Sequence, residues 1–395
     1  MRTSLQFLWP QILCFLLFTS QYQVHTKSTI EPCNSSDSCP SLLSYLLPWD
    51  SKVSEIATRF HVNFSDILAS NSLFPITSSS AHQILRANTL VKIPISCFCV
   101  DGIRRSMSTI YTVHAADTLA SISEGYGGLV SGEQIKSVNS INATNPLTSG
   151  GTLVIPLPCT CFNNVNNGGT AVYMSYVVQR GESLRSIASK FGTTISDLET
   201  VNEFWEAAVD PGDILSIPIA ACSSATLNWY DESMIVPNGS YTLTATNCIK
   251  CSCEPMDITM RCVPSGLDVP CYNLRCKESN LIIGNECVEH SATACNVIQC
   301  VYRGHKGGKI LSSMKNSSYL KCSGNYADDD PCHSEASCWP LSSYPEDPFG
   351  MSPNPSPSLP LPVSQASLRT RASNGRLGQF LINVLPIFLL LKFIL

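Results

Sequence analysis

The side chains best suited to catalysis lie in the last third of the chain. Three consecutive carboxylates stand at Asp328 to Asp330, and histidines stand at His290, His305 and His333. A glycosidase needs two carboxylates about 5–9 Å apart on a rigid cleft, and a cysteine peptidase needs a low-pKa thiolate beside a histidine. The acidic run precedes a proline and is better explained as an acidic turn in solvent. With no serine elbow, phosphate-binding glycine loop or kinase signature in the sequence, we expect no enzymatic activity, no metal and no cofactor.

Cysteine is the other reactive residue type, with 20 in the 395 residues. The spacing Cys248-x-x-Cys251-x-Cys253 could hold zinc. So high a cysteine content is instead typical of an oxidising compartment, in which thiols form disulfides. The 13 cysteines from Cys222 to Cys338 predict a disulfide scaffold, but their spacing does not determine the connectivity. Loss of Cys14 with a signal peptide would leave an odd number, so one cysteine is free or pairs between chains.

Composition restricts the partners. Charged residues make up 14% of the chain and the formal net charge is −5. There is thus no basic surplus to neutralise phosphates, which argues against binding to nucleic acid. The length predicts two to four small domains rather than one large core.

Both ends carry targeting signals. Residues 1–26 have the charged, apolar and small-residue order of a secretory signal peptide, with a retained signal anchor as the alternative. Residues 374–395 end in an apolar tail that suits a propeptide for a glycosylphosphatidylinositol (GPI) anchor attached at Ser373. An attachment point between Ser364 and Ser367 would give a longer spacer, and a short tail anchor or membrane span is the alternative. Residues 340–372, rich in proline and serine, predict an extended stalk.

Five Asn-x-Ser/Thr sequons agree with passage through the secretory pathway. They lie at Asn34, Asn63, Asn142, Asn238 and Asn316. We therefore expect a glycoprotein on the extracellular face of the cell membrane.

A repeat organises the first half of the chain. Ile93-Pro94, Ile155-Pro156 and Ile217-Pro218 recur at intervals of 62 residues, each in a β-prone run. Because proline cannot donate to a ladder, we expect each proline to end its strand at a sheet edge. Upstream of each, apolar residues spaced i, i+3, i+4, i+7 predict a short helix, and a capped second helix follows. The helical stripes begin at Val53, Leu119 and Leu184, and the second helices close on Asn71, Asn139 and Asn202. With a strand before the first helix, each unit has the order strand, helix, helix, strand.

The third unit carries a specific resemblance. Tyr176-Val177-Val178, Gly181-Glu182-Ser183-Leu184 and the closing Gly212-Asp213-x-Leu215-x-Ile217-Pro218 are similar to a lysin motif (LysM) from end to end. The match is good in the second unit and weaker in the first. Three such units behind a signal peptide, with Cys-x-Cys pairs between them, a cysteine-rich tail and a lipid-anchor signal, resemble the plant GPI-anchored LysM receptor-like proteins. The expected fold is α+β, with three tandem LysM (βααβ) modules at 41–95, 109–157 and 175–219, tied by disulfides between modules and followed by a cysteine-rich region at 222–339.

The resemblance also implies disulfides, ligands and partners. The implied pairs are Cys33–Cys99, Cys39–Cys161 and Cys97–Cys159. The family binds chitin oligomers or peptidoglycan through their N-acetylglucosamine, so we expect a pattern-recognition receptor of innate immunity. A lipid-anchored chain does not reach the cytosol, which predicts signalling through a transmembrane LysM receptor kinase, with homo-oligomers forming on the ligand.

The expected binding surface lies where the loop after the first strand meets the loop before the last strand. Backbone groups there can pair with acetamido groups, and small apolar side chains can cover the methyl groups. In the second unit, which we favour, the candidates are His114, Ala115, Ala116, Asp117, Thr118, Ile141, Ala143, Asn145, Pro146 and Leu147. In the third unit they are Gln179, Arg180, Gly181, Glu182, Asp210, Pro211 and Gly212. A glycan on Asn142 would block the second site. A secreted cell-wall glycan hydrolase and a wall-adhesion protein that does not signal are the alternatives.

Overall fold

A computed structural model describes residues 31–319 except 35, 74–75, 205–207, 228–232 and 291–294. All of these residues belong to one compact unit, Met1–Ser342. The predicted signal peptide, the stalk, Ser373 and the GPI propeptide lie outside the described residues, as do the carboxylates at 328–330. No helix in the described ranges is both long and apolar enough to cross a membrane.

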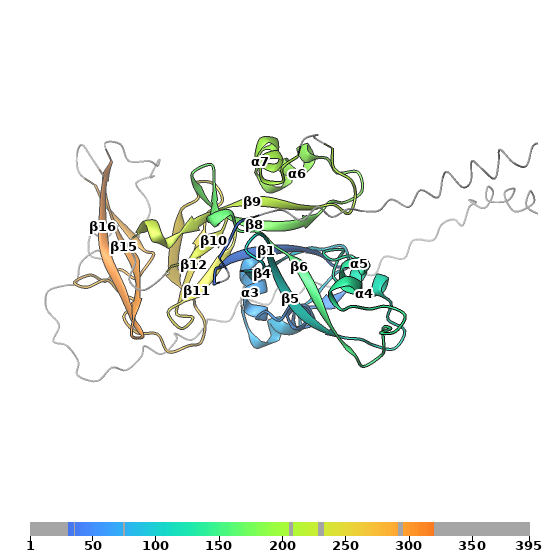
Figure 1. Cartoon of the computed structure of the whole chain (residues 1–395). Coiled ribbons are helices and arrows are strands. Elements are labelled where there is room, and N and C mark those ends of the chain that lie inside the picture. The colour runs from blue at the N-terminus through green and yellow to red at the C-terminus, as the bar shows by residue number, and fades with distance from the viewer. Residues whose placement is uncertain are drawn as a thin grey trace, which may run out of the picture. The chain divides into compact units, whose positions relative to one another are not determined.

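The order strand, helix, helix, strand occurs three times (Figure 1). The first unit contains β1 Ser38–Leu46, β2 Ser51–Lys52, α2 Val53–Phe60, α3 Phe64–Ser70, a 3₁₀ turn Ser78–His82, β3 Ile84–Leu85 and β4 Leu90–Cys99. The second contains β5 Arg105–Thr112, α4 Leu119–Gly125, α5 Gly132–Val138 and β6 Thr152–Pro158. After a 3₁₀ turn Phe162–Asn164 and β7 Val165–Asn166, the third contains β8 Gly169–Val177, α6 Leu184–Phe191, α7 Ile195–Val201 and β9 Ile214–Ser223.

The helices form where the sequence pattern predicts them, but the cap expected for the second helix of the first unit is wrong, because the side chain of Asn63 makes no capping hydrogen bond at the start of α3. In α2 the apolar stripe Val53, Ile56, Ala57 and Phe60 is buried along one face. The helix α5 has a reciprocal cap, because Ser131 Oγ accepts from the backbone of Gln134 and the side chain of Gln134 accepts from the backbone of Ser131. The helix α7 is capped in the same way by Thr194 and Asp197.

The six long strands of these units join into one sheet. Each unit pairs its own first and last strands antiparallel, β1 with β4, β5 with β6 and β8 with β9. The units then meet edge to edge, since β1 runs parallel to β8 at Leu42–Met174 and β4 pairs with β5 at Cys99–Arg105. The strand order is β10-β9-β8-β1-β4-β5-β6, with β7 beside β8.

The expectation that each proline ends its strand is wrong. Pro94, Pro156 and Pro218 lie inside β4, β6 and β9, and each strand continues beyond its proline. At each position the strand has a paired neighbour on one side only: Pro94 lies opposite Leu42, while β4 meets β5 only at its far end. Proline has no backbone N–H to donate, so it is tolerated inside a strand where its nitrogen faces the side that has no neighbouring strand.

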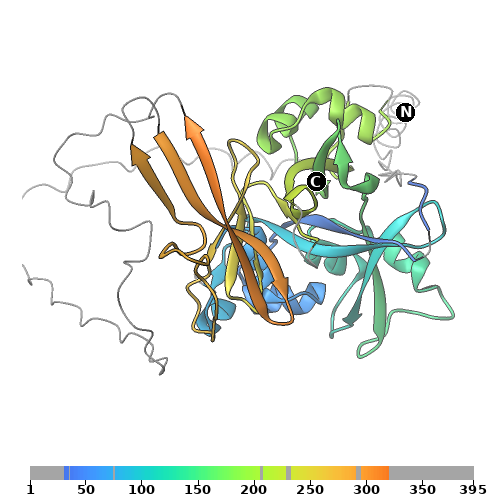
Figure 2. The same cartoon turned by 90° about the vertical axis from the view of Figure 1, so that its left-hand side faces the viewer.

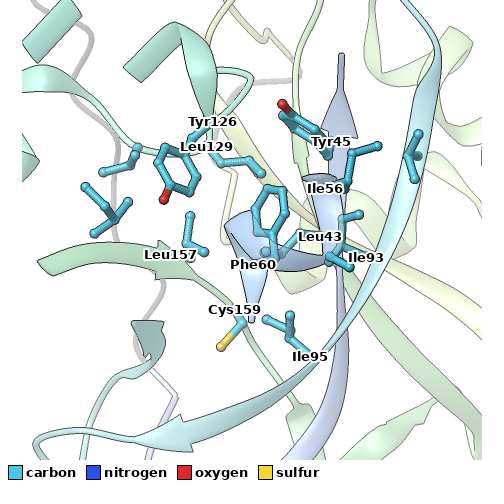
Figure 3. Close-up of a cluster of buried hydrophobic side chains, with 14 of the residues drawn as sticks. Leu43, Tyr45, Ile56, Phe60, Ile93, Ile95, Tyr126, Leu129, Leu157 and Cys159 are labelled. Atoms are coloured by element: carbon cyan, nitrogen blue, oxygen red, sulfur yellow. The ribbon is translucent and has the colours of Figure 1, made fainter. Parts of the chain in front are cut away.

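The buried side chains of the three units form two main clusters. The first and second units share one cluster of buried side chains, which Val177 of the third unit joins, and most of the third unit's buried side chains form a second cluster together with Leu42 of β1. In the shared cluster Phe60 of α2 contacts both Tyr45 and Tyr126, with ring centroids 4.9 and 5.6 Å apart (Figure 3). Tyr126 is only 1% exposed, so it is a packing residue.

Disulfides and one buried ion pair join the units. The structure pairs Cys33 with Cys99, Cys39 with Cys161 and Cys97 with Cys159, the same pairs that the resemblance implies. Near them, Glu31 Oε1 accepts from Arg105 Nε at 2.9 Å, and both of its carboxylate oxygens accept backbone N–H groups at 161 and 162. This ion pair is buried and therefore fixes the N-terminal segment against the loop after β6.

The cysteine-rich region forms two small sheets beyond β10, Ile235–Pro237 (Figure 2). One contains β11 Tyr241–Thr244, β12 Ile249–Cys253 and β13 Met260–Pro264; the other contains β14 Glu286–His290, β15 Cys295–Lys306 and β16 Lys309–Tyr319. Its described disulfides are Cys222–Cys253, Cys248–Cys271, Cys251–Cys262 and Cys276–Cys300. The first sheet also contacts α3 and the residues after it. Ser240, just before β11, donates from Oγ to the Ser70 carbonyl at the end of α3, and Tyr241 Oη donates to the carbonyl of Leu73, which follows the helix.

Candidate glycan-binding loops

In every unit the loop after the first strand lies against the turn before the last strand. Val113 exchanges backbone hydrogen bonds with Gly150 and Gly151 in the second unit, with lengths of 2.8 and 2.9 Å. Val178 does the same with Gly212 and Asp213 in the third, both at 2.9 Å. In the first unit Leu47 bonds to the backbone at 88 and 89. The same two-stranded closure thus places the two loops side by side three times.

The turn before the last strand has one conformation in all three units. It spans 86–89, 148–151 and 210–213, closes with a backbone bond from its fourth residue to its first, and has positive φ at its third residue: Asn88, Gly150 or Gly212. Residues 148–151 are not among the candidates predicted from the sequence. The 62-residue interval of the Ile-Pro pairs also separates these turns and could have found them.

A carboxylate holds the first loop of the second unit in shape. Asp117 Oδ2 accepts from the His114 backbone N–H at 2.7 Å and from Tyr111 Oη at 2.9 Å. Burial raises the pKa of Asp117, but these hydrogen bonds outweigh it, and the net pKa lies below the ordinary value. Burial and the bond to Asp117 raise the pKa of Tyr111 to about 12. Asp117 therefore organises the loop and is not poised for proton transfer at neutral pH.

The third unit repeats this arrangement with longer side chains. Glu182 accepts from the Gln179 backbone N–H at 2.9 Å and from Tyr176 Oη at 2.7 Å. Lys190 Nζ lies 2.9 Å from Tyr176 Oη and 3.2 Å from Glu182 Oε1. Burial opposes ionisation of Glu182, but the Gln179, Tyr176 and Lys190 donors prevail and lower its pKa. In this unit, too, a carboxylate that accepts a hydrogen bond from the loop backbone holds the loop in shape.

The middle of the loop is exposed in both the second and the third unit. Ala115, Ala116, Arg180 and Gly181 are exposed, and within the described residues their backbone N–H groups make no hydrogen bond. Ala116 and Gly181 have φ of 70° and 84°. An exposed backbone N–H group without a partner could pair with an acetamido group.

The remaining candidates of the second unit form a loop beside the 148–151 turn. Ile141 and Leu147 are half-buried and pack against the shared core, whereas Ala143, Asn145 and Pro146 are exposed. The side chain of Asn142 shapes this loop, since its Oδ1 accepts from the backbone N–H groups of Thr144 and Asn145 at 2.9 Å. The sequon amide therefore lies directly on the candidate surface.

The first unit differs at the same place. Ser51 stands where the other units have Asp117 and Glu182. The guanidinium carbon of Arg59 lies over the ring of Trp49, 5.3 Å from the ring centroid. Arg59 Nη1 in turn donates to the Gly125 carbonyl of the second unit at 2.7 Å. Trp49 thus takes part in the contact between the first and second units, although it and Asp50 are exposed.

The structure brings the third-unit candidates together at one end of that unit: Gln179, Arg180, Gly181 and Glu182 face Asp210, Pro211 and Gly212 across the Val178 closure. In the second unit, His114, Ala115, Ala116, Asp117 and Thr118 face 148–151 across the Val113 closure. Four cavities of about 180 to 1040 Å³ in the described part of the chain are lined by other residues. The candidate site is thus an open surface. Among the predicted sequons Asn34, Asn63, Asn142 and Asn316 are exposed and Asn238 is half-buried.

Comparison with known proteins decides the family. The LysM domain model matches residues 111–156 and 176–218. The chain is 43% identical over 324 residues to "LysM domain-containing GPI-anchored protein 1" of Arabidopsis thaliana, covering 80% of this chain and 78% of the relative. The chain belongs to the plant LysM domain-containing GPI-anchored proteins.

Two relatives from Oryza sativa subsp. japonica extend the comparison. "LysM domain-containing GPI-anchored protein LYP6" is 42% identical over 75% of this chain and 74% of its own length. "Chitin elicitor-binding protein" is 30% identical over 70% of this chain and 77% of its own length. The two matched LysM segments contain the closures at Val113 and Val178, so the family's motif and the candidate loops coincide in this member of the family.

Proposed function

We propose that this LysM protein is a cell-surface pattern-recognition receptor that binds N-acetylglucosamine-containing glycans, namely chitin oligomers, peptidoglycan or both. The observation that carries the proposal is the exposed backbone of 115–116 and 180–181, whose N–H groups have no partner among the described residues, in loops held by Asp117 and Glu182. A relative whose name records chitin elicitor binding supports the ligand class. The first unit, with the same βααβ order, is proposed as a third LysM module.

The proposed receptor is not an enzyme. It is anchored through GPI at Ser373, carries N-glycans at the five sequons, forms homo-oligomers on the ligand and signals through a LysM receptor kinase in plant immunity. The proposed module boundaries are those expected from the sequence.

Bulky side chains in the loops test the binding surface. Ala115→Trp in the second unit and Arg180→Trp in the third occupy equivalent exposed positions, so each should block one loop without disturbing the core. Ser137→Trp and Ser189→Trp, on exposed positions of α5 and α6, are the matched controls. We expect at least one loop variant to weaken chitin-hexamer binding to the full chain by about tenfold or more, a loss of about 1.4 kcal/mol, measured by calorimetry.

Unchanged affinity in the Ala115→Trp, Arg180→Trp double variant would refute the site. Cleavage of the chitin hexamer into shorter oligomers by the wild-type chain would refute a non-enzymatic role. An Asn142→Gln variant that binds more tightly than wild type would show that a glycan restricts the second unit. A glycan array separates chitin from peptidoglycan. Co-precipitation with a LysM receptor kinase only in the presence of oligomers would support the signalling partner.

A further inference from the structure

Within the cysteine-rich region, the segment 271–319 has a charge opposite to that of the whole chain. Between 271 and 319 there are six lysine and arginine residues and three glutamates, a net charge of +3, whereas the whole chain carries −5. This local basic surplus has no role in a site made of neutral backbone amides. It therefore points to a second ligand.

Four of these cations line one cavity of about 550 Å³. They are Arg275, Lys277, Arg303 and Lys309. Its lining contains no carboxylate, and within the described residues none of the four cations makes an ion pair. Four like charges around one cavity repel each other, so an anion that enters it removes repulsion as well as gaining attraction.

Rigid elements hold the cations in place. Arg303 lies on β15 at the irregularity between Tyr302 and His305, and its Nε donates to Ser313 Oγ of β16 at 2.7 Å. The opposite wall is tied to β15 by the disulfide between Cys276, which lies between Arg275 and Lys277, and Cys300. The Arg275 carbonyl also accepts from Ser312 Oγ at 3.3 Å. The site is thus built on paired strands and a disulfide.

The remaining lining favours a sugar acid over a bare anion. Asn273 and Ser312 offer hydrogen-bonding groups, and Leu311 offers an apolar surface for a ring face. Guanidinium groups bind planar carboxylates in a two-bond geometry, while lysine attracts them as a point charge. We propose that this cavity binds an acidic oligosaccharide, an oligouronate, through its ring carboxylates, separately from the N-acetylglucosamine loops.

Removal of charge from the cavity tests the proposal. Lys277→Ala with Lys309→Ala removes two exposed lysines of the lining; Lys306→Ala with Lys315→Ala removes two exposed lysines of β15 and β16 outside it. The two double variants have the same net charge. We expect the first to weaken binding of oligogalacturonate to the full chain by about tenfold and the second to leave it nearly unchanged. Added salt should weaken wild-type binding, because ions screen exposed charges.

The methyl ester of the same oligogalacturonate has the same backbone without the charge, and it should not bind. Equal binding of acid and ester, equal losses in the two double variants, or no binding of the acid by wild type would each overturn the proposal. Binding of phosphatidylserine vesicles through Lys277 and Lys309 without binding of the oligouronate would assign the cavity to a membrane instead. Melting curves check that both variants fold, and chitin-hexamer binding should be unaffected in both, so this test is independent of the proposed receptor function.

Discussion

At the scale of single residues, side chains of different length hold the equivalent loop in the second and third units. Asp117 and Glu182 reach the same loop backbone from chains of different length, and the longer one recruits Lys190 as well. Gly125 occupies the helix position that holds Arg59 in the first unit and Lys190 in the third. A side chain there would meet Trp49, whose ring lies 3.4 Å from an added Cβ. The positions of the loop residues could be predicted from the sequence. Only the structure shows which side chains hydrogen-bond to the loop backbone and which pack against another unit.

The Asp117 carboxylate predicts a pH-dependent stability. Its pKa is lowered in the folded protein, so its stabilisation is fully present above the unfolded-state pKa of about 3.9 and is lost as pH falls through the folded-state pKa. We expect Asp117→Asn to be less stable than wild type by about 1 kcal/mol at pH 7 and to approach it at low pH. Glu133→Gln, an exposed carboxylate of the same unit, is the control. Urea unfolding at several pH values measures the difference, and a gap that stays constant down to pH 2 would contradict the assignment.

At the scale of elements, an asparagine ties the second helix of each unit to the last strand. Asn202 Nδ2 donates to the carbonyls of Leu198 and Ser216, and its Oδ1 accepts from the Ser216 backbone N–H. Asn71 and Asn139 make the same three bonds to their own helices and strands. The spacing to Asn71, Asn139 and Asn202 was visible in the sequence. The hydrogen bonds of these asparagines to the last strand could not be predicted, because the bonded strand residue lies 14 to 21 residues away in the sequence.

Removal of one such tie should loosen its unit. Asn202 is buried, so Asn202→Ala leaves backbone groups of α7 and β9 without partners, and we expect a loss of about 2–4 kcal/mol. The half-exposed Asn139 should cost less when changed to alanine, because water can replace its bonds. Thermal unfolding of the two variants measures this order, and a larger loss for Asn139→Ala would contradict it.

At the scale of the whole molecule, the units do not stand alone. The first two share one core around Phe60, while the third has a core of its own apart from Leu42 of β1, which it meets along a short parallel stretch. Ser41 Oγ donates to the Tyr173 carbonyl across that junction. We therefore expect the first and second units to open as one cooperative block and the third to open separately.

Truncation of Phe60 tests this division. Phe60→Ala removes the ring between Tyr45 and Tyr126 and should cost about 3–5 kcal/mol. Hydrogen exchange should then accelerate in α4 of the second unit as well as in α2, while α6 keeps its protection. Ile187→Ala in the core of the third unit is the counterpart and should accelerate α6 alone. Faster exchange in all three units from either variant would show that they share one cooperative fold.

The sequence by itself determined the local elements, the repeat and the use of cysteine in disulfides, because helical stripes, caps and cysteine content act over a few residues or through composition. The predictions for the ends of the chain came from the same local patterns. Only the tertiary structure decided which turn lies beside each loop, how the cysteines of the second half pair, and how Arg275 and Lys309 come to line one cavity. These features depend on closures between distant segments, and many such closures are compatible with one local pattern. The prolines show the difference most plainly: their chemistry forbids a hydrogen bond, but whether that ends a strand depends on whether a neighbour lies on the affected side.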